Sequence, residues 1–459
     1  MRNFVSSSSS SISGWTAHLR SRLESFSISE LGGVFGHPYL IPIAATTKIS
    51  SRCQGTRVVF MQIHLLREQE FVKLYGMSAN SLCSQQRITT DALLIKPLSH
   101  DGCLRFHDQK GTGSMATSRL HSFEICAGAG GQALGLEQAG FHHAAVVEID
   151  NWAAETLRQN RGTEGPLGKW NVHEMDVHDL DGRPWRGKID LFAGGVPCPP
   201  FSIAGKQLGA DDERDLFPQA LRLINEIDPR AVLLENVKGL GQKRFDPYRN
   251  QIIDQLEKMG YTAFWKLLQA ADYGVPQLRP RFILVALKNE FANYFAWPKV
   301  VKSHTPVGTA LLPLMAENGW PGAEAWARNA NTVGPTLVGG SKKHGGPDVG
   351  PTRAREAWKK LGIKGSSIAE SPPAADFTTD PEQEMPRLTV RMGGVIQGFP
   401  EDWKWAGGKT AQWRQVGNAF PPPVAKAIGE RIKFALRKKP IPKSLEPATP
   451  TRVNQLSLI

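Results

Sequence analysis

Apolar runs of strand length alternate with amphipathic segments of helix length along the middle of the chain. Each run has the length of a buried strand, and the runs cover residues 123–126, 144–149, 189–193, 231–236, 263–268 and 281–287. Segments with helical spacing separate them, one ending at Gly140 and the others covering 151–160, 216–227 and 248–259. Strands that alternate with helices predict an α/β protein with a mostly parallel sheet covered on both faces.

This pattern stops near residue 291, which predicts a second, smaller domain. Residues 292 to about 385 are rich in Gly, Pro, Trp and basic residues without a steady period, so we expect irregular structure there. Regular structure returns at 387–399, and 419–436 is typical of a closing helix. The expected organisation is a main domain, an irregular domain, a closing segment that packs back on the main domain, and a disordered tail, with bounds 119–290, 291–405, 406–436 and 437–459.

Residues 1–118 differ from the rest of the chain. They open with a serine run, Ser6 to Ser11, carry few acidic residues and show no long amphipathic period. An Arg- and Ser-rich, acid-poor start resembles an organelle transit peptide. The alternative, which we favour, is that translation begins downstream near Met115, so that 1–118 is a disordered or non-native extension.

Composition narrows the class of protein. No apolar run reaches the roughly 18 residues of a membrane helix, so no membrane contact is expected. The 5 cysteines are scattered without C-x-x-C spacing, which predicts neither a metal site nor disulfides and favours a reducing cytoplasm. The formal charge of +12 favours a polyanionic partner such as nucleic acid.

One cysteine stands directly after a predicted strand. Gly194 and Gly195 end the run 189–193, and Pro197 and Pro199 flank Cys198. Proline fixes the backbone and restricts the residue before it, so the thiol lies on a stiff, non-helical loop. In α/β proteins this edge of the sheet binds ligands. The alternative is a small buried apolar residue, the usual fate of a free cysteine.

A nucleoside site is predicted beside this loop. Gly128, Gly130 and Gly131 lie between the first strand and its helix, where backbone can approach a ligand closely. Their spacing is not G-x-G-x-x-G, so a dinucleotide is not indicated. Glu148 ends the next strand, at the place where a ribose hydroxyl is held. Asp176, in Met175-Asp176-Val177, ends an expected third strand. These features suit a nucleoside without phosphates, such as S-adenosylmethionine.

Charged groups follow two further strands. Glu235 ends the run 231–236, and Arg279 and Arg281 precede the run 281–287. The arginines suit either a ligand or a structural ion pair. Because strand ends meet at one edge of the sheet, thiol, carboxyl and guanidinium groups are expected to converge beside the nucleoside site.

These motifs, taken in order, resemble those of the cytosine-5 DNA methyltransferases of bacterial restriction–modification systems. The resemblance spans Phe123 to about Ile432, roughly two thirds of the chain. It rests on motifs at 123–131, 148, 176, 195–198, 235–237, 277–281, 387–391, 397–400 and 415–419. It implies a Rossmann-like S-adenosylmethionine-dependent fold with a target-recognition domain.

The resemblance also implies roles for single residues. Cys198 would attack carbon 6 of a cytosine flipped out of duplex DNA, Glu235 would hold its N3 and amino group, and Arg281, with Arg279, would contact the base. The implied cofactor-binding residues are Phe123, Gly128, Gly130, Gly131, Glu148, Ile149, Asp176, Val177, Pro197, Asn418 and Ala419. The implied DNA-binding residues are Ser202, Gln277, Thr336, Gly339, Gly340, Lys342 and Lys343.

Several positions depart from the family pattern, among them Met392 after Arg391, where an acidic residue is common. Pro199 stands where most members have glutamine, Cys126 where they have phenylalanine, and Glu124 where they have aspartate. Two other functions stay open. The first alternative is a tRNA cytosine-5 methyltransferase, which shares the catalytic motifs. The second is a non-catalytic DNA-binding relative. We expect a monomer that acts on double-stranded DNA, either as a solitary methylase or beside a separately acting restriction endonuclease.

Overall fold

The computed structural model divides the chain into two compact units, Met1–Thr112 and Gly113–Ile459. It describes residues 45–53, 56–63, 119–161, 170–197, 215–301, 303–339 and 346–451. In the first unit the described strands β1 (Ala45–Cys53) and β2 (Thr56–Ile63) pair antiparallel. This pair was not expected from the sequence, and the remainder of the expected extension lies outside the described residues.

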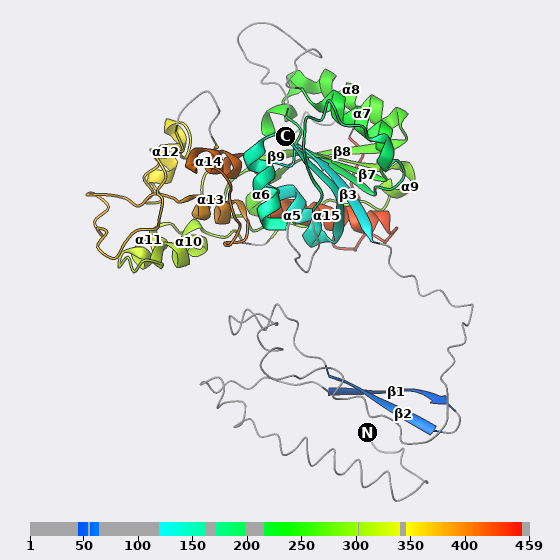
Figure 1. Cartoon of the computed structure of the whole chain (residues 1–459), viewed down its shortest axis with the longest axis horizontal. Helices are drawn as coiled ribbons and strands as arrows, with labels where there is room; N and C mark the ends of the chain where they lie inside the picture. Colours follow the sequence, from blue (N-terminus) through cyan, green and yellow to red (C-terminus); the bar gives the residue numbers. More distant parts are fainter. Residues whose placement is uncertain are drawn as a thin grey trace, which may run out of the picture. The chain divides into compact units, whose positions relative to one another are not determined.

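A seven-stranded sheet forms the centre of the second unit (Figure 1), in the order β5-β4-β3-β6-β7-β9-β8. Strand β9 is antiparallel to both of its neighbours, and the other described neighbours pair in parallel. The bounds are β3 Leu120–Ile125, β4 Phe141–Glu148, β5 Val172–Glu174, β6 Leu191–Gly194, β7 Ala231–Val237, β8 Tyr261–Gln269 and β9 Pro280–Lys288. The predicted α/β class with a mostly parallel sheet is confirmed.

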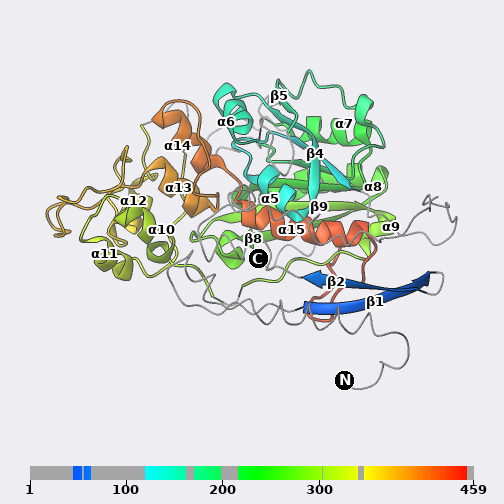
Figure 2. The same cartoon turned by 60° about the horizontal axis from the view of Figure 1, so that its bottom comes forward.

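Helices cover both faces of this sheet (Figure 2). On one face α5 (Gly131–Ala139) lies against α15 (Pro422–Leu436), so closely that a methyl group at Gly135 would come within 2.4 Å of the Pro422 carbonyl oxygen. On the other face α7 (Phe217–Ile227) and α8 (Asp246–Lys258) bury their apolar sides against the sheet. Helix α6 (Asn151–Arg161) follows β4. The expected closing helix therefore packs back on the main sheet.

The region expected to be irregular contains several helices. Among the described residues of 292 to about 385 they are α10 Val307–Ala316, α11 Ala323–Asn329 and α12 Thr352–Lys359. Helix α9 (Asn289–Ala292) precedes this region, and α13 (Val390–Gln397) and α14 (Lys409–Asn418) follow it, α13 within 387–399 where regular structure was expected to return. Helices α10 to α14 share a core built around Trp326, Trp358 and Trp413. Most are too short to give a clear helical period, and Pro313 interrupts the pattern inside α10.

The expected disordered tail is wrong for residues 437–451. Thr451 donates its N–H to the Ala263 carbonyl (3.1 Å) and its Oγ1 accepts from the Trp265 N–H (2.9 Å). Strand β8 lies at the edge of the sheet, and the tail satisfies backbone groups that an edge strand leaves open. Residues 452–459 lie outside the described residues. No helix in the described part of the chain is long and apolar enough to cross a membrane.

Candidate functional site

A cavity of about 720 Å³ opens at the carboxyl ends of β3, β4, β5, β6 and β7. Loops after the strands and the end of α14 form its walls. Eight of the predicted cofactor-binding residues line it: Gly128, Glu148, Ile149, Asp176, Val177, Pro197, Asn418 and Ala419. The cavity also reaches Glu235, so the predicted nucleoside site and the predicted carboxyl group adjoin one space.

Glu148 organises the wall nearest the glycine loop. Its Oε2 accepts from the Gly128 N–H (2.7 Å), and its Oε1 accepts from the N–H groups of Ile149 (3.0 Å) and Asp150 (2.8 Å). Burial raises the pKa of this carboxyl above its ordinary value, while the three N–H groups oppose the shift. A carboxylate offers about four acceptor positions, so one stays available to a ligand hydroxyl.

Three predicted cofactor-binding residues instead pack the protein interior, which corrects the expectation. Phe123 is fully buried and stacks against Phe192. A methyl group at Gly130 would lie 2.6 Å from the Leu157 side chain, and one at Gly131 would lie 2.1 Å from the Phe420 carbonyl oxygen. These glycines permit close packing of α5, and none of the three residues lines the cavity.

Glu124 lines the cavity, and the environment of its carboxyl group is unusual. The residue is fully buried, and neither carboxylate oxygen has a well-formed hydrogen bond within the described residues. Burial raises the pKa of the Glu124 carboxyl well above its ordinary value, although a backbone N–H contact from Ala133 opposes the shift. Such a group is stabilised when a cation or a donor enters beside it. Cys126, at the start of the glycine loop, also lines the cavity, and burial raises the pKa of its thiol.

Asp176 also lines the cavity, and the contacts of its carboxylate favour the ionised form. Its Oδ1 accepts from the His178 N–H (2.9 Å) and contacts the His178 Nδ1 (2.7 Å). These contacts, the backbone N–H first, lower the pKa of Asp176. With Glu124, Glu148, Asp176 and Glu235 on its walls, the cavity suits a ligand that carries positive charge.

Glu235 and Arg281 form the second part of the site. Their charged groups lie 2.5 Å apart, with each side chain only about a tenth exposed. They face each other because β7 and β9 pair antiparallel, which sets Val237 opposite Arg281. The neighbouring Asn236 donates its Nδ2 to the Val196 carbonyl (2.8 Å) and so fixes the chain two residues before Cys198.

Arg279 does not reach the cavity, contrary to the expected base contact. Its side chain is 0 % exposed, and its guanidinium donates to the carbonyl oxygens of Leu337 (2.9 Å), Gly417 (2.6 Å) and Ala419 (2.9 Å). The three acceptors belong to the smaller domain and to the end of α14. Arg279 therefore ties these segments to the start of β9.

The described residues expected to touch DNA make hydrogen bonds or close contacts within the protein. Gln277 is fully buried, donates to Gln397 (3.1 Å) and accepts from the Leu337 N–H (2.7 Å). Thr336 donates to the Leu278 carbonyl. A methyl group at Gly339 would lie 2.5 Å from the Arg414 carbonyl oxygen, so this glycine permits packing on α14. Five predicted residues lie outside the described ones: Cys198, Ser202, Gly340, Lys342 and Lys343.

Sequence reasoning missed several residues that line the cavity. They are Glu124, Cys126, Gln132, Asp150, Met175, His178, Arg414 and Gln415, among others. Their neighbours in sequence were identified, so a search one or two residues to either side would have found most of them. Arg414 pairs with Asp150 (3.4 Å) and joins α14 to the loop after β4. The described residues contain no group of three or more potential metal ligands.

Comparison with known proteins places these observations in one family. The model of the C-5 cytosine-specific DNA methylases matches residues 120–434. The type II methyltransferase M.NaeI of Lentzea aerocolonigenes is 54% identical over 318 residues, 69% of this chain and 75% of that protein. The type II methyltransferase M.NgoMIV of Neisseria gonorrhoeae is 52% identical over 328 residues, 69% of this chain and 98% of that protein.

Proposed function

Because the chain belongs to the C-5 cytosine-specific DNA methylase family, we propose how its own residues methylate cytosine in DNA. The chain is a DNA cytosine-5 methyltransferase of the bacterial restriction–modification type. One observation supports the assignment of the residues. The cavity at one edge of the sheet is lined both by the acidic residues predicted to bind the nucleoside and by Glu235.

S-adenosylmethionine fits the cavity by charge and by donors. The cofactor supplies an electrophilic methyl group on a sulfonium centre, and its methionine part carries an ammonium group. The buried Glu124 carboxyl, which has no well-formed protein hydrogen bond, would accept from such a cation. The remaining acceptor position on Glu148 suits a ribose hydroxyl, and Asp176 would accept from the adenine amino group.

Cys198 is the proposed nucleophile. Its thiolate forms a bond to carbon 6 of a cytosine held outside the duplex, which makes carbon 5 electron-rich enough to take a methyl group. Loss of the carbon 5 proton then restores the double bond and releases the thiolate. The Asn236 contact to Val196 supports this role, because it holds the chain that leads into the Pro-Cys-Pro segment.

Glu235 and Arg281 are proposed to hold the flipped base. The carboxyl of Glu235 would contact N3 and the amino group, where charge changes as carbon 6 is attacked. Arg281 keeps that carboxyl in place through the 2.5 Å ion pair and would donate to the base.

Duplex DNA is the proposed substrate, and the smaller domain is the proposed reader of its sequence. Lys342 and Lys343 would neutralise phosphates, which gives a binding affinity that falls as salt rises. The similarity to type II methyltransferases supports a separately acting cognate endonuclease and a cytoplasmic location beside the chromosome.

Methyl transfer to defined substrates tests the proposal. The purified protein is incubated with S-adenosylmethionine labelled in the methyl group and with either duplex DNA or tRNA. We expect label in duplex DNA, with bisulfite sequencing showing 5-methylcytosine within one recurring site. Label in tRNA alone would support the tRNA enzyme, and no label in either would contradict the catalytic assignment.

A further inference from the structure

The loop after β5 forms one wall of the cavity, yet the sheet holds it only weakly. Residues 175–178 line the cavity. Strand β5 is three residues long and lies at the edge of the sheet, paired only with β4. Contacts from outside the sheet must therefore fix the backbone of Asp176 and Val177.

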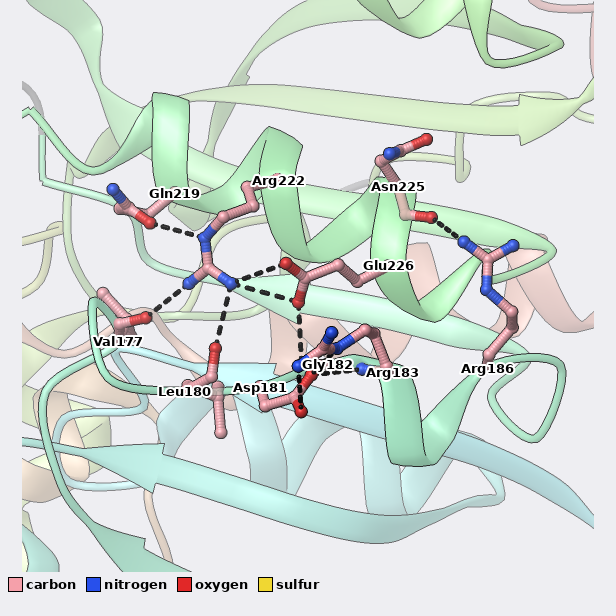
Figure 3. A network of polar contacts seen from close by, with 10 residues as sticks. All are labelled: Val177, Leu180, Asp181, Gly182, Arg183, Arg186, Gln219, Arg222, Asn225 and Glu226. Carbon is pink, nitrogen blue, oxygen red and sulfur yellow. Dashed lines mark hydrogen bonds and ion pairs between the residues drawn. The ribbon is translucent and has the colours of Figure 1, made fainter.

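Arg222 of α7 supplies these contacts (Figure 3). Its guanidinium donates to the carbonyl oxygens of Val177 and Leu180, each at 2.9 Å. Val177 is itself a residue of the cavity wall. An exposed Arg–Glu pair alone stabilises a protein little, but here the same guanidinium also binds two backbone carbonyls of one loop.

Further contacts hold the guanidinium and the far part of the loop. Glu226 accepts from Arg222 at 2.9 Å and 3.0 Å, and Gln219 accepts from its Nε at 2.8 Å. Glu226 also accepts from the Gly182 N–H (2.8 Å). Gly182 lies so near α7 that a methyl group there would come within 2.9 Å of Ile227. The loop is thus fixed to α7 at both of its ends.

From this network we infer that Arg222 is a positioning residue for the cofactor. It holds the Asp176–Val177 backbone in the conformation that binds the adenosine part of S-adenosylmethionine. The same helix begins beside the target-base segment, since the Leu216 N–H donates to the Pro197 carbonyl (3.3 Å) and Leu216 lines the cavity. The inference rests on the proposed cofactor site.

Cofactor affinity in Arg222→Met tests the inference. If the loop then keeps its binding conformation about one tenth of the time, the Kd for S-adenosylhomocysteine rises about tenfold. At saturating S-adenosylmethionine, kcat stays within about twofold, because the reacting groups are unchanged. Arg186→Met is the matched control, since Arg186 donates to the Asn225 carbonyl of the same helix (2.8 Å) far from the cavity wall; its Kd should not change.

Calorimetric titration of the full-length variants separates the outcomes. An Arg222→Met protein that binds as tightly as wild type would overturn the inference. If the wild-type protein bound neither S-adenosylmethionine nor S-adenosylhomocysteine, the proposed cofactor site itself would be overturned. Should Arg222→Met not fold, Arg222→Lys decides: it keeps the charge but cannot reach both carbonyls, so an unchanged Kd overturns the inference and a raised Kd supports it.

Discussion

Arg279 and Arg281 stand two residues apart, but their side chains have different roles in the structure. Arg279 donates three hydrogen bonds to buried carbonyl oxygens, whereas Arg281 pairs with Glu235 beside the cavity. We predict that Arg279→Met lowers stability and that Arg281→Met lowers turnover. The family resemblance had implied a base contact for both, while the residues alone left a structural ion pair equally open.

The size of the Arg279 effect follows from its contacts. Hydrogen bonds from a charged donor contribute about 1.5–3 kcal/mol each, so three give a gross contribution of about 5–9 kcal/mol. Burial of the cation offsets several kcal/mol of this, and the same burial lowers the pKa of Arg279 well below its ordinary value. We expect a net loss of about 2–4 kcal/mol in the free energy of unfolding.

Urea unfolding monitored by tryptophan fluorescence measures this loss as a lower midpoint concentration of urea. Under saturating substrates at low temperature, folded Arg279→Met should turn over within a few-fold of wild type. Arg281→Met leaves the largely buried Glu235 carboxylate without its ion-pair partner, so we expect it to cost about 3–5 kcal/mol in the free energy of unfolding. Folded Arg281→Met should also lose about 100-fold or more in kcat. An Arg279→Met protein with the wild-type midpoint and a collapsed kcat would refute this division.

Three further predictions concern packing, charge and the tail. Gly417→Ala should cost about 1–3 kcal/mol of stability, since a methyl group there would lie 1.9 Å from the Gly339 nitrogen, while Gly408→Ala, which meets no atom within 4 Å, should be neutral by urea unfolding. The raised pKa of Glu124 means that wild type loses stability as pH rises from about 4.3, the unfolded value, through the higher folded value. Glu124→Gln should remove that loss in urea midpoints taken across this pH range, and calorimetry should show weaker S-adenosylmethionine binding; a parallel pH profile would contradict the assignment. Removal of residues after 439 should expose β8, which Thr451 contacts, and produce self-association visible by light scattering; a monodisperse truncated protein would count against this role of the tail.

The sheet was predictable because its signals are local. Most strands are short apolar runs, and Glu148 and Glu235 lie at the ends of two of them. Strand β5 (Val172–Glu174) is the exception, because it contains a histidine and a glutamate, and Asp176 follows it closely. Parallel strands bring their carboxyl ends to one edge, so the position of these acids followed from strand type alone. The cavity wall they form agrees with that reasoning.

The remainder depended on contacts between residues far apart in the chain. Arg279 binds carbonyl groups 58, 138 and 140 residues away, so its burial could not be deduced from its neighbours. Gly339 was expected to face DNA, but in the structure it packs against Gly417. Thr451 is ordered by β8, 186 residues earlier. In each case a residue type that suits a ligand serves the fold.

Covalent trapping tests the central claim most directly. Duplex DNA that carries 5-fluorocytosine at the methylated site cannot lose its carbon 5 substituent as a proton, so the enzyme stays attached through its nucleophile. With S-adenosylmethionine present, denaturing electrophoresis should show a protein–DNA complex for wild type and for Cys126→Ala, and none for Cys198→Ala. A complex that persists in Cys198→Ala, or none in wild type that binds both substrates, would contradict the account.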